Sequence, residues 1–115
     1  MSLKGVIIEE SLKDNRMLND ITITAVRISK EEEPQSRWHV YTVLVGKQQI
    51  ESIAKNLKEG TWYTHFWDNQ GNVTAIFSGS KVFDFNYHNK QTWEAAIAYG
   101  LKLGIPKDQL DFPID

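Results

Sequence analysis

The chain has 115 residues, 41% of them hydrophobic and 24% charged, a composition typical of one soluble globular domain and not of a disordered chain. Thirteen basic and fifteen acidic side chains give a net charge of −2, and neither half of the chain is basic, so binding to nucleic acid is disfavoured. The absence of cysteine excludes disulfides, thiolate metal sites and a cysteine nucleophile. No apolar run reaches the ~18 residues of a membrane span and no signal peptide is evident, so we expect a cytoplasmic protein without a membrane partner.

The first part of the chain predicts a strand followed by a hairpin. Residues 5–10 begin as a short apolar strand, and residues 11–19 indicate a helical turn or an irregular connection. Residues 21–28 are rich in β-branched side chains, and their inward face is ambiguous, which is compatible with a β-bulge. Residues 38–45 predict the next strand, paired with 21–28 across the polar loop 29–37.

The middle of the chain predicts a helix followed by a three-stranded meander. Apolar residues at positions i, i+3, i+4 and i+7 predict a helix within 47–58. Residues 62–68, 73–77 and 81–86 have the composition of strands and are separated by short turns that contain glycine. Consecutive strands joined in this way pair as antiparallel neighbours.

A second helix is predicted from about residue 90 to residue 103, with Asn89 as its N-cap and Gly104 as its stop signal. The tail beyond it carries Phe112 and other apolar residues and is expected to pack back on the body. The order of elements predicts an α+β fold in one domain over residues 1–115. We expect a single antiparallel sheet of about five to six strands with two main helices packed on one face, a two-layer sandwich. Such a sheet leaves its other face open.

Aromatic residues supply the candidate site. Ten of the thirteen lie within residues 62–99, and the densest piece is 62–67. Alternate residues of a strand face opposite sides, so both faces of this strand carry large aromatic side chains. One core cannot take up both sets, so we expect aromatic surface on the open face or at its edge. The candidate binding or interface residues are Trp62, Tyr63, His65 and Trp67.

These residues predict a small binding or assembly module that acts through an aromatic sheet face. Tryptophan and tyrosine are enriched at interface hot spots, so the expected partner is a second copy of the chain, forming a homodimer, or another protein. Stacking of bases or of a small ligand on the aromatic rings is a further functional interpretation. The purely structural interpretation is that the rings pack in the core under the helices.

An enzyme or a small-ligand-binding domain is the alternative. A metal-assisted or acid–base enzyme would use His65 and His88 with Asp68 or Asp84, because imidazole and carboxylate groups bind divalent metals when a fold brings them together. No two histidines have a local chelating spacing, and the chain has neither a nucleophile elbow nor a phosphate-binding glycine loop. The sequence therefore assigns no catalytic residue, no metal ligand and no cofactor. The sequence does not decide whether the protein is an enzyme, but the missing motifs weigh against enzymatic activity.

Several segments together resemble a family of small, uncharacterised prokaryotic proteins. They are spread over nearly the whole chain and comprise residues 4–12, Trp62 and Tyr63 with Phe66, Lys81 to Phe83, residues 99–106, Gln109, and Asp111 with Phe112. The resemblance implies one intact domain and no catalytic residues, since it brings no established activity. Met1, Ser2 and Leu3 look like a leader added for expression.

Overall fold

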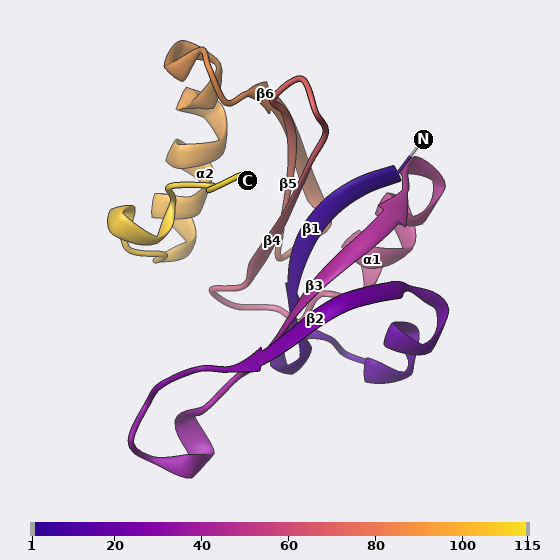
Figure 1. Ribbon diagram of the computed structural model, residues 1–115. Helices are drawn as coiled ribbons and strands as arrows, with labels where there is room; N and C mark the ends of the chain where they lie inside the picture. Colours follow the sequence, from indigo (N-terminus) through magenta and orange to yellow (C-terminus); the bar gives the residue numbers. More distant parts are fainter. Residues whose placement is uncertain (1, 115) are drawn as a thin grey trace.

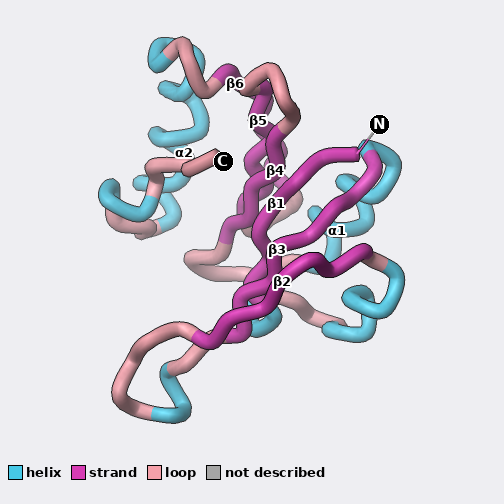
Figure 2. The backbone as a smooth tube through the Cα atoms, viewed as in Figure 1, coloured by secondary structure: helices cyan, strands magenta, loops and turns pink. Residues whose placement is uncertain are grey.

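A six-stranded antiparallel sheet runs through the computed structural model, which describes residues 2–114 (Figure 1). Its strands are β1 (Ser2–Ile8), β2 (Thr22–Ile28), β3 (His39–Gly46), β4 (Tyr63–Trp67), β5 (Asn72–Phe77) and β6 (Lys81–Asn86). Their order across the sheet is β2-β3-β1-β4-β5-β6, and every neighbouring pair is antiparallel. The predicted β2–β3 hairpin and β4–β5–β6 meander are both confirmed. Strand β1 joins them by pairing with β3 and β4, as the backbone trace shows (Figure 2).

Two main helices accompany the sheet, α1 (Ile50–Asn56) and α2 (Glu94–Leu103). The α+β fold class is therefore confirmed, and both helices lie within the segments predicted for them. Gly104 ends α2 in the left-handed conformation, with φ of 96°, and Asn89 caps the 3-10 turn that leads into α2. None of the helices within residues 2–114 is long and apolar enough to cross a membrane.

The arrangement of the helices differs from the expected one, because α1 and α2 lie on opposite faces of the sheet (Figure 1). Helix α1 covers one core, which includes Leu3, Ile7, Val43, Val45, Ile53, Phe66 and Ile76. Helix α2 covers another, which includes Val73, Ala75, Phe77, Phe85, Trp93 and Phe112. Phe66 and Trp67 are consecutive in β4 but belong to different cores, as strand alternation requires. We name the two faces the α1 face and the α2 face.

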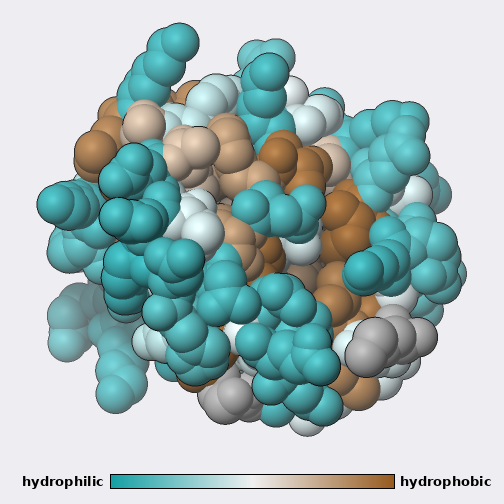
Figure 3. Space-filling model, turned by 90° about the horizontal axis from the view of Figure 1, so that it is seen from above, coloured by the Kyte–Doolittle hydropathy of each residue, from teal (hydrophilic) through white to brown (hydrophobic). Residues whose placement is uncertain are grey.

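The reason lies in the pattern of β4, whose aromatic residues point to both faces. Apolar side chains on two faces need two covers, because each uncovered ring would leave a large apolar surface in water. Over β4, β5 and β6 the second cover is α2 together with the C-terminal segment, residues 104–114. The face expected to be open is therefore covered along these three strands. Seen from above, apolar residues form a band between polar side chains and also reach the surface at one margin of the molecule (Figure 3).

The start of the chain takes part in this fold. Ser2 pairs with Gly46 of β3, and Leu3 is 6% exposed within the core on the α1 face. The two residues therefore behave as part of β1, whatever their origin. Met1, the other residue of the expected leader, lies outside the described residues.

Strand β2 forms one edge of the sheet, and all seven of its residues are exposed. The pairing of β2 with β3 shifts register between Ile23 and Ala25. This shift is the bulge that the ambiguous alternation of residues 21–28 indicated. Its effect is to place Ile23 on the same face as Val26, because the two pair with Val43 and Tyr41.

Gly5 in β1 allows a close approach at the centre of the sheet. It pairs with Phe66 of β4, whose side chain is fully buried and lies across the glycine. A Cβ atom at Gly5 would collide with the Phe66 ring and would come within 2.9 Å of the His65 carbonyl oxygen. The packing of Phe66 therefore requires glycine at this position.

We expect Gly5→Ala to destabilise the protein by about 1–3 kcal/mol, because the extra methyl group overpacks the core. Urea unfolding followed by circular dichroism measures the loss. The same substitution in a Phe66→Leu background should be less harmful, because the smaller side chain leaves room for the methyl group. Equal losses in the two backgrounds would contradict this account of Gly5.

Candidate functional site

Strand β4 and the residue before it carry the four side chains that the sequence singles out for binding. Tyr63, His65 and Trp67 point to the α2 face, and Trp62 precedes the strand. His65 and Trp67 are buried, whereas Trp62 and Tyr63 are half-buried. The ring of Trp62 lies 5.6 Å from that of Trp38, centroid to centroid, with the planes tilted by 58°. Most of the aromatic surface of β4 is thus internal.

The C-terminal segment lies over these side chains and is tied to them. The hydroxyl of Tyr63 donates a hydrogen bond to the carbonyl oxygen of Gln109. Nε2 of His65 donates to the carbonyl oxygen of Pro113 at 2.7 Å. Phe112 is fully buried, with its ring centroid 5.5 Å from that of Tyr63 and 5.9 Å from that of His65. Tyr63 and His65 therefore hold the end of the chain on the sheet.

A groove of about 380 Å³ remains beside the C-terminal segment, and we call it the C-terminal groove. Its apolar and aromatic lining includes Val6, Ile8, Trp38 and Tyr63. Its polar lining includes Arg27, His65, Gln109 and Asp111. Tyr63 and His65 are among the candidate residues predicted from the sequence, whereas the other lining residues are not. They come from β1, β2, the start of the β3 region and the chain end, and no local pattern in the sequence links these segments.

Burial keeps the two titratable rings of the groove uncharged at neutral pH. It lowers the pKa of His65, and the bond to Pro113 and the charge of Asp111 oppose this effect only in part. Burial also raises the pKa of Tyr63 to about 12, and the negative charge of Asp111 adds to the rise. The imidazole of His65 is therefore neutral and carries its proton on Nε2.

The charged groups of the groove are Arg27 and Asp111, which are both exposed. The guanidinium of Arg27 makes no hydrogen bond or ion pair with any residue between 2 and 114. It therefore offers its five N–H donors to solvent or to a ligand, in a planar geometry that matches carboxylate and phosphate groups. Because the neighbouring lining is apolar, the groove can accommodate an apolar body attached to an acidic group.

The histidines and aspartates of the alternative site are only partly brought together. Asp68 and Asp84 line one hollow of about 400 Å³ together with Lys47. Asp68 has a lowered pKa, chiefly because it accepts a hydrogen bond from the side-chain amide of Asn72, the first residue of β5. His65 lies on the α2 face instead, and His88 is exposed outside the hollow. No group of three or more histidine, aspartate and glutamate side chains in residues 2–114 is placed to hold a metal ion.

A second group of titratable residues links the 3-10 turn after β1 to strand β3. The sequence does not predict that these residues lie together. Nδ1 of His39 lies 2.7 Å from Oε2 of Glu10, and the hydroxyl of Tyr41 donates to Oε1 of Glu9 at 2.6 Å. The hydrogen bond to Glu10 raises the pKa of His39 above 6.5. Desolvation raises the pKa of Glu10, but its hydrogen bonds from His39 outweigh this effect and lower it. The sequence does not reveal these pairs, because they depend on the β1–β3 register.

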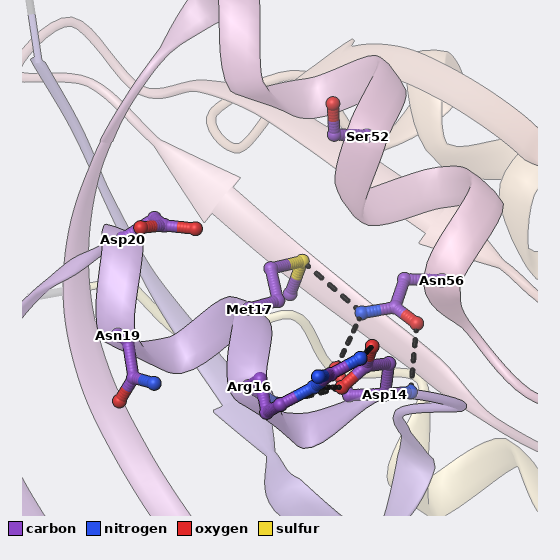
Figure 4. Close-up of a pocket in the computed structure, with 7 residues that line it drawn as sticks. All are labelled: Asp14, Arg16, Met17, Asn19, Asp20, Ser52 and Asn56. Atoms are coloured by element: carbon purple, nitrogen blue, oxygen red, sulfur yellow. Dashed lines mark hydrogen bonds and ion pairs between the residues drawn. The ribbon is translucent and has the colours of Figure 1, made fainter.

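A hollow of about 540 Å³ lies between α1 and the 3-10 turn that precedes β2 (Figure 4). The Asn56 side chain spans it: its Oδ1 accepts from the amide of Asp14, and its Nδ2 donates to the Asp14 carbonyl oxygen, both at 2.9 Å. Nδ2 also lies 3.4 Å from Sδ of Met17. Arg16 forms a two-point ion pair with the Asp14 carboxylate. These polar groups satisfy one another, so they fasten the turn to α1 and are not poised for a ligand.

Comparison with known proteins adds no relative, since no family model, no curated protein and no solved structure matches the chain. The resemblance to a small prokaryotic family therefore stays a prediction from the sequence.

We expect Asn56→Ala to destabilise the protein by about 1–2 kcal/mol, because two backbone groups of Asp14 lose their hydrogen-bond partner. Urea unfolding provides the measurement. Ser52→Ala is the matched control, because Ser52 is an exposed residue of the same helix and lines the same hollow. It should change the free energy of unfolding by less than about 0.5 kcal/mol. If both variants behave alike, Asn56 does not fasten the turn.

We expect His39 and His65 to titrate on opposite sides of pH 6.5 in NMR titrations of their ring protons. The pKa of His65 is lower in the folded protein than in the unfolded chain. As the pH falls through 6.5, the unfolded chain therefore takes up a proton that the folded protein does not, and the folded state loses stability. The folded pKa of His39 is raised, so its contribution is present below 6.5 and is lost as the pH rises through the folded value.

Urea unfolding at several pH values checks the consequence of this difference. His65→Gln should reduce the loss of stability on acidification, and His39→Gln should increase it. A ring of His65 that titrates at or above 6.5 would contradict the burial of its neutral form.

Proposed function

We propose that the protein is a small binding module that takes an organic anion with an apolar or aromatic body in the C-terminal groove. The observation that carries the proposal is the guanidinium of Arg27, which has no partner among residues 2–114 and lies beside an apolar and aromatic lining. Ligand sites combine an apolar lining with a few polar groups that fix orientation, and their volumes begin near that of this groove, at about 300 Å³. The polar group supplied here is cationic, so the ligand should be anionic.

The lining also limits the shape and the charge of the ligand. Val6 and Ile8 are half-buried and present apolar surface, and Trp38 is 38% exposed, which leaves its ring available for stacking. Asp111 lines the same groove and would repel a second negative charge. A ligand with a single carboxylate therefore fits better than a polyanion, and nucleic acid is not proposed as a partner.

The predictions of location, self-association and enzymatic activity made from the sequence remain hypotheses. A cytoplasmic location is compatible with a chain that has no cysteine to oxidise. Self-association through the aromatic face of β4 has less support, because α2 and the C-terminal segment cover most of that face. An acid–base or metal-assisted enzyme has less support, because the hollow that contains Asp68 and Asp84 lacks both histidines of the predicted set.

We expect aromatic and aliphatic monocarboxylates to raise the unfolding temperature, whereas the matching uncharged amides should not. Suitable probes are indole-3-acetate, 4-phenylbutyrate and octanoate, each against its amide. Chemical-shift changes in ¹H–¹⁵N spectra should fall on the groove residues, Arg27 and Trp38 among them. An acid at about 100 times its dissociation constant adds ~2.7 kcal/mol to the free energy of unfolding.

Arg27→Ala should weaken the binding of these acids at least about tenfold, because it removes a charge-assisted hydrogen bond. Lys30→Ala is the control, since it removes the same charge from the adjoining loop outside the groove. Amides that bind as tightly as the acids, or shift changes away from the groove, would refute the proposal.

A further inference from the structure

The edge strand β2 exposes three large apolar side chains on the α1 face. Ile23, Val26 and Ile28 are 40%, 57% and 49% exposed, and we call them the β2 surface. They share one face because they pair with Val43, Tyr41 and His39 of β3, which alternate along that strand. None of the three belongs to the core that α1 covers. Contiguous apolar patches on a protein surface mark interaction sites.

The backbone of the same strand has a free edge. The amide of Ser29 donates to the carbonyl oxygen of Trp38 on the β3 side. Successive residues of a strand direct their hydrogen-bonding groups to alternate sides, so those of Arg27 also point toward β3. The amides and carbonyls of Val26 and Ile28 then point outward, where residues 2–114 supply no further strand. An apolar face beside an unpaired backbone edge is a template for another strand.

The opposite edge of the sheet shows how an edge is kept from pairing. Strand β6 has the exposed charged residues Lys81 and Asp84, and charges on an edge strand oppose the docking of a further strand. The one charged residue of β2, Arg27, points to the α2 face, where it lines the C-terminal groove. The α1 face of β2 therefore lacks the protection that β6 has.

We propose that β2 pairs with β2 of a second copy of the chain, in antiparallel orientation, to form a homodimer with the two sheets continuous. A two-fold axis through Val26 places the two Val26 side chains together and sets Arg27 of each chain opposite Ala25 of the other. No like charges then face each other, whereas an axis through Arg27 would oppose two guanidinium groups. In this register the strand meets its own apolar face and opposes no like charges, which favours a second copy as the occupant.

The bulge between Ile23 and Ala25 limits the regular edge to residues 25–28, so the paired segment is short. A short segment predicts a reversible dimer whose population depends on concentration. Different substitutions test the two proposals, because the side chains of the β2 surface lie on the α1 face and the Arg27 side chain lines the groove on the α2 face. A failure of one proposal therefore leaves the other standing.

Sedimentation equilibrium over about 10 µM to 1 mM tests the pairing. We expect the apparent mass to rise from the monomer value of 13.3 kDa toward twice that value. Val26→Lys with Ile28→Lys should raise the dimer dissociation constant at least about tenfold, because it places charges on the edge. Val82→Lys is the matched control: Val82 is 43% exposed on the other edge strand, and its replacement should leave association unchanged.

Circular dichroism establishes that each variant folds. If the double lysine variant does not fold, Val26→Thr with Ile28→Thr takes its place, since threonine keeps the β-branched shape and strand preference while making the surface more polar. This variant should also weaken the dimer. A chain that stays monomeric at every concentration refutes the proposal. Association that survives the β2 substitutions, or that is lost in Val82→Lys, refutes it as well.

Discussion

Strand β4 is apolar on both faces, and the burial of both faces is the constraint on which the rest of the structure depends. Phe66 faces α1 and Trp67 faces α2, and each is at most 7% exposed. A strand of this kind is stable only in the interior of a sheet with a cover on each side. The central position of β4, the close approach of β1 at Gly5 and the placement of the helices on opposite faces all satisfy this requirement.

The second cover accounts for the candidate site. Helix α2 alone does not hide the aromatic rings at the start of β4, and the C-terminal segment completes the cover through Phe112 and the bonds from Tyr63 and His65. The C-terminal groove lies beside this segment, where the sheet continues under it toward β1 and β2. Tyr63 and His65 therefore both anchor the chain end and line the groove that we propose as the binding site.

The cover does not extend over β2, and the difference between the two ends of the sheet follows from this. At the β6 end, Phe85 packs against Trp93, which leads into α2, and exposed charges protect the edge. At the β2 end, the apolar side chains of Val26 and Ile28 remain in contact with solvent. Under the proposed pairing, a sheet with one protected and one unprotected edge would add a strand at one end only, so the product would be a dimer and not a fibre.

The sequence by itself determined the strands, the helices and their fold class, because each depends on local periodicity and turn residues that a linear pattern displays. It also showed that residues 62–67 carry too much aromatic surface for one core, and it selected Tyr63 and His65. Only the tertiary structure decided which element covers each face. It also joined Arg27, Trp38 and Asp111 to those two residues and paired His39 with Glu10. These relations depend on strand order and register, which are set by packing between distant segments and leave no periodic trace in the chain.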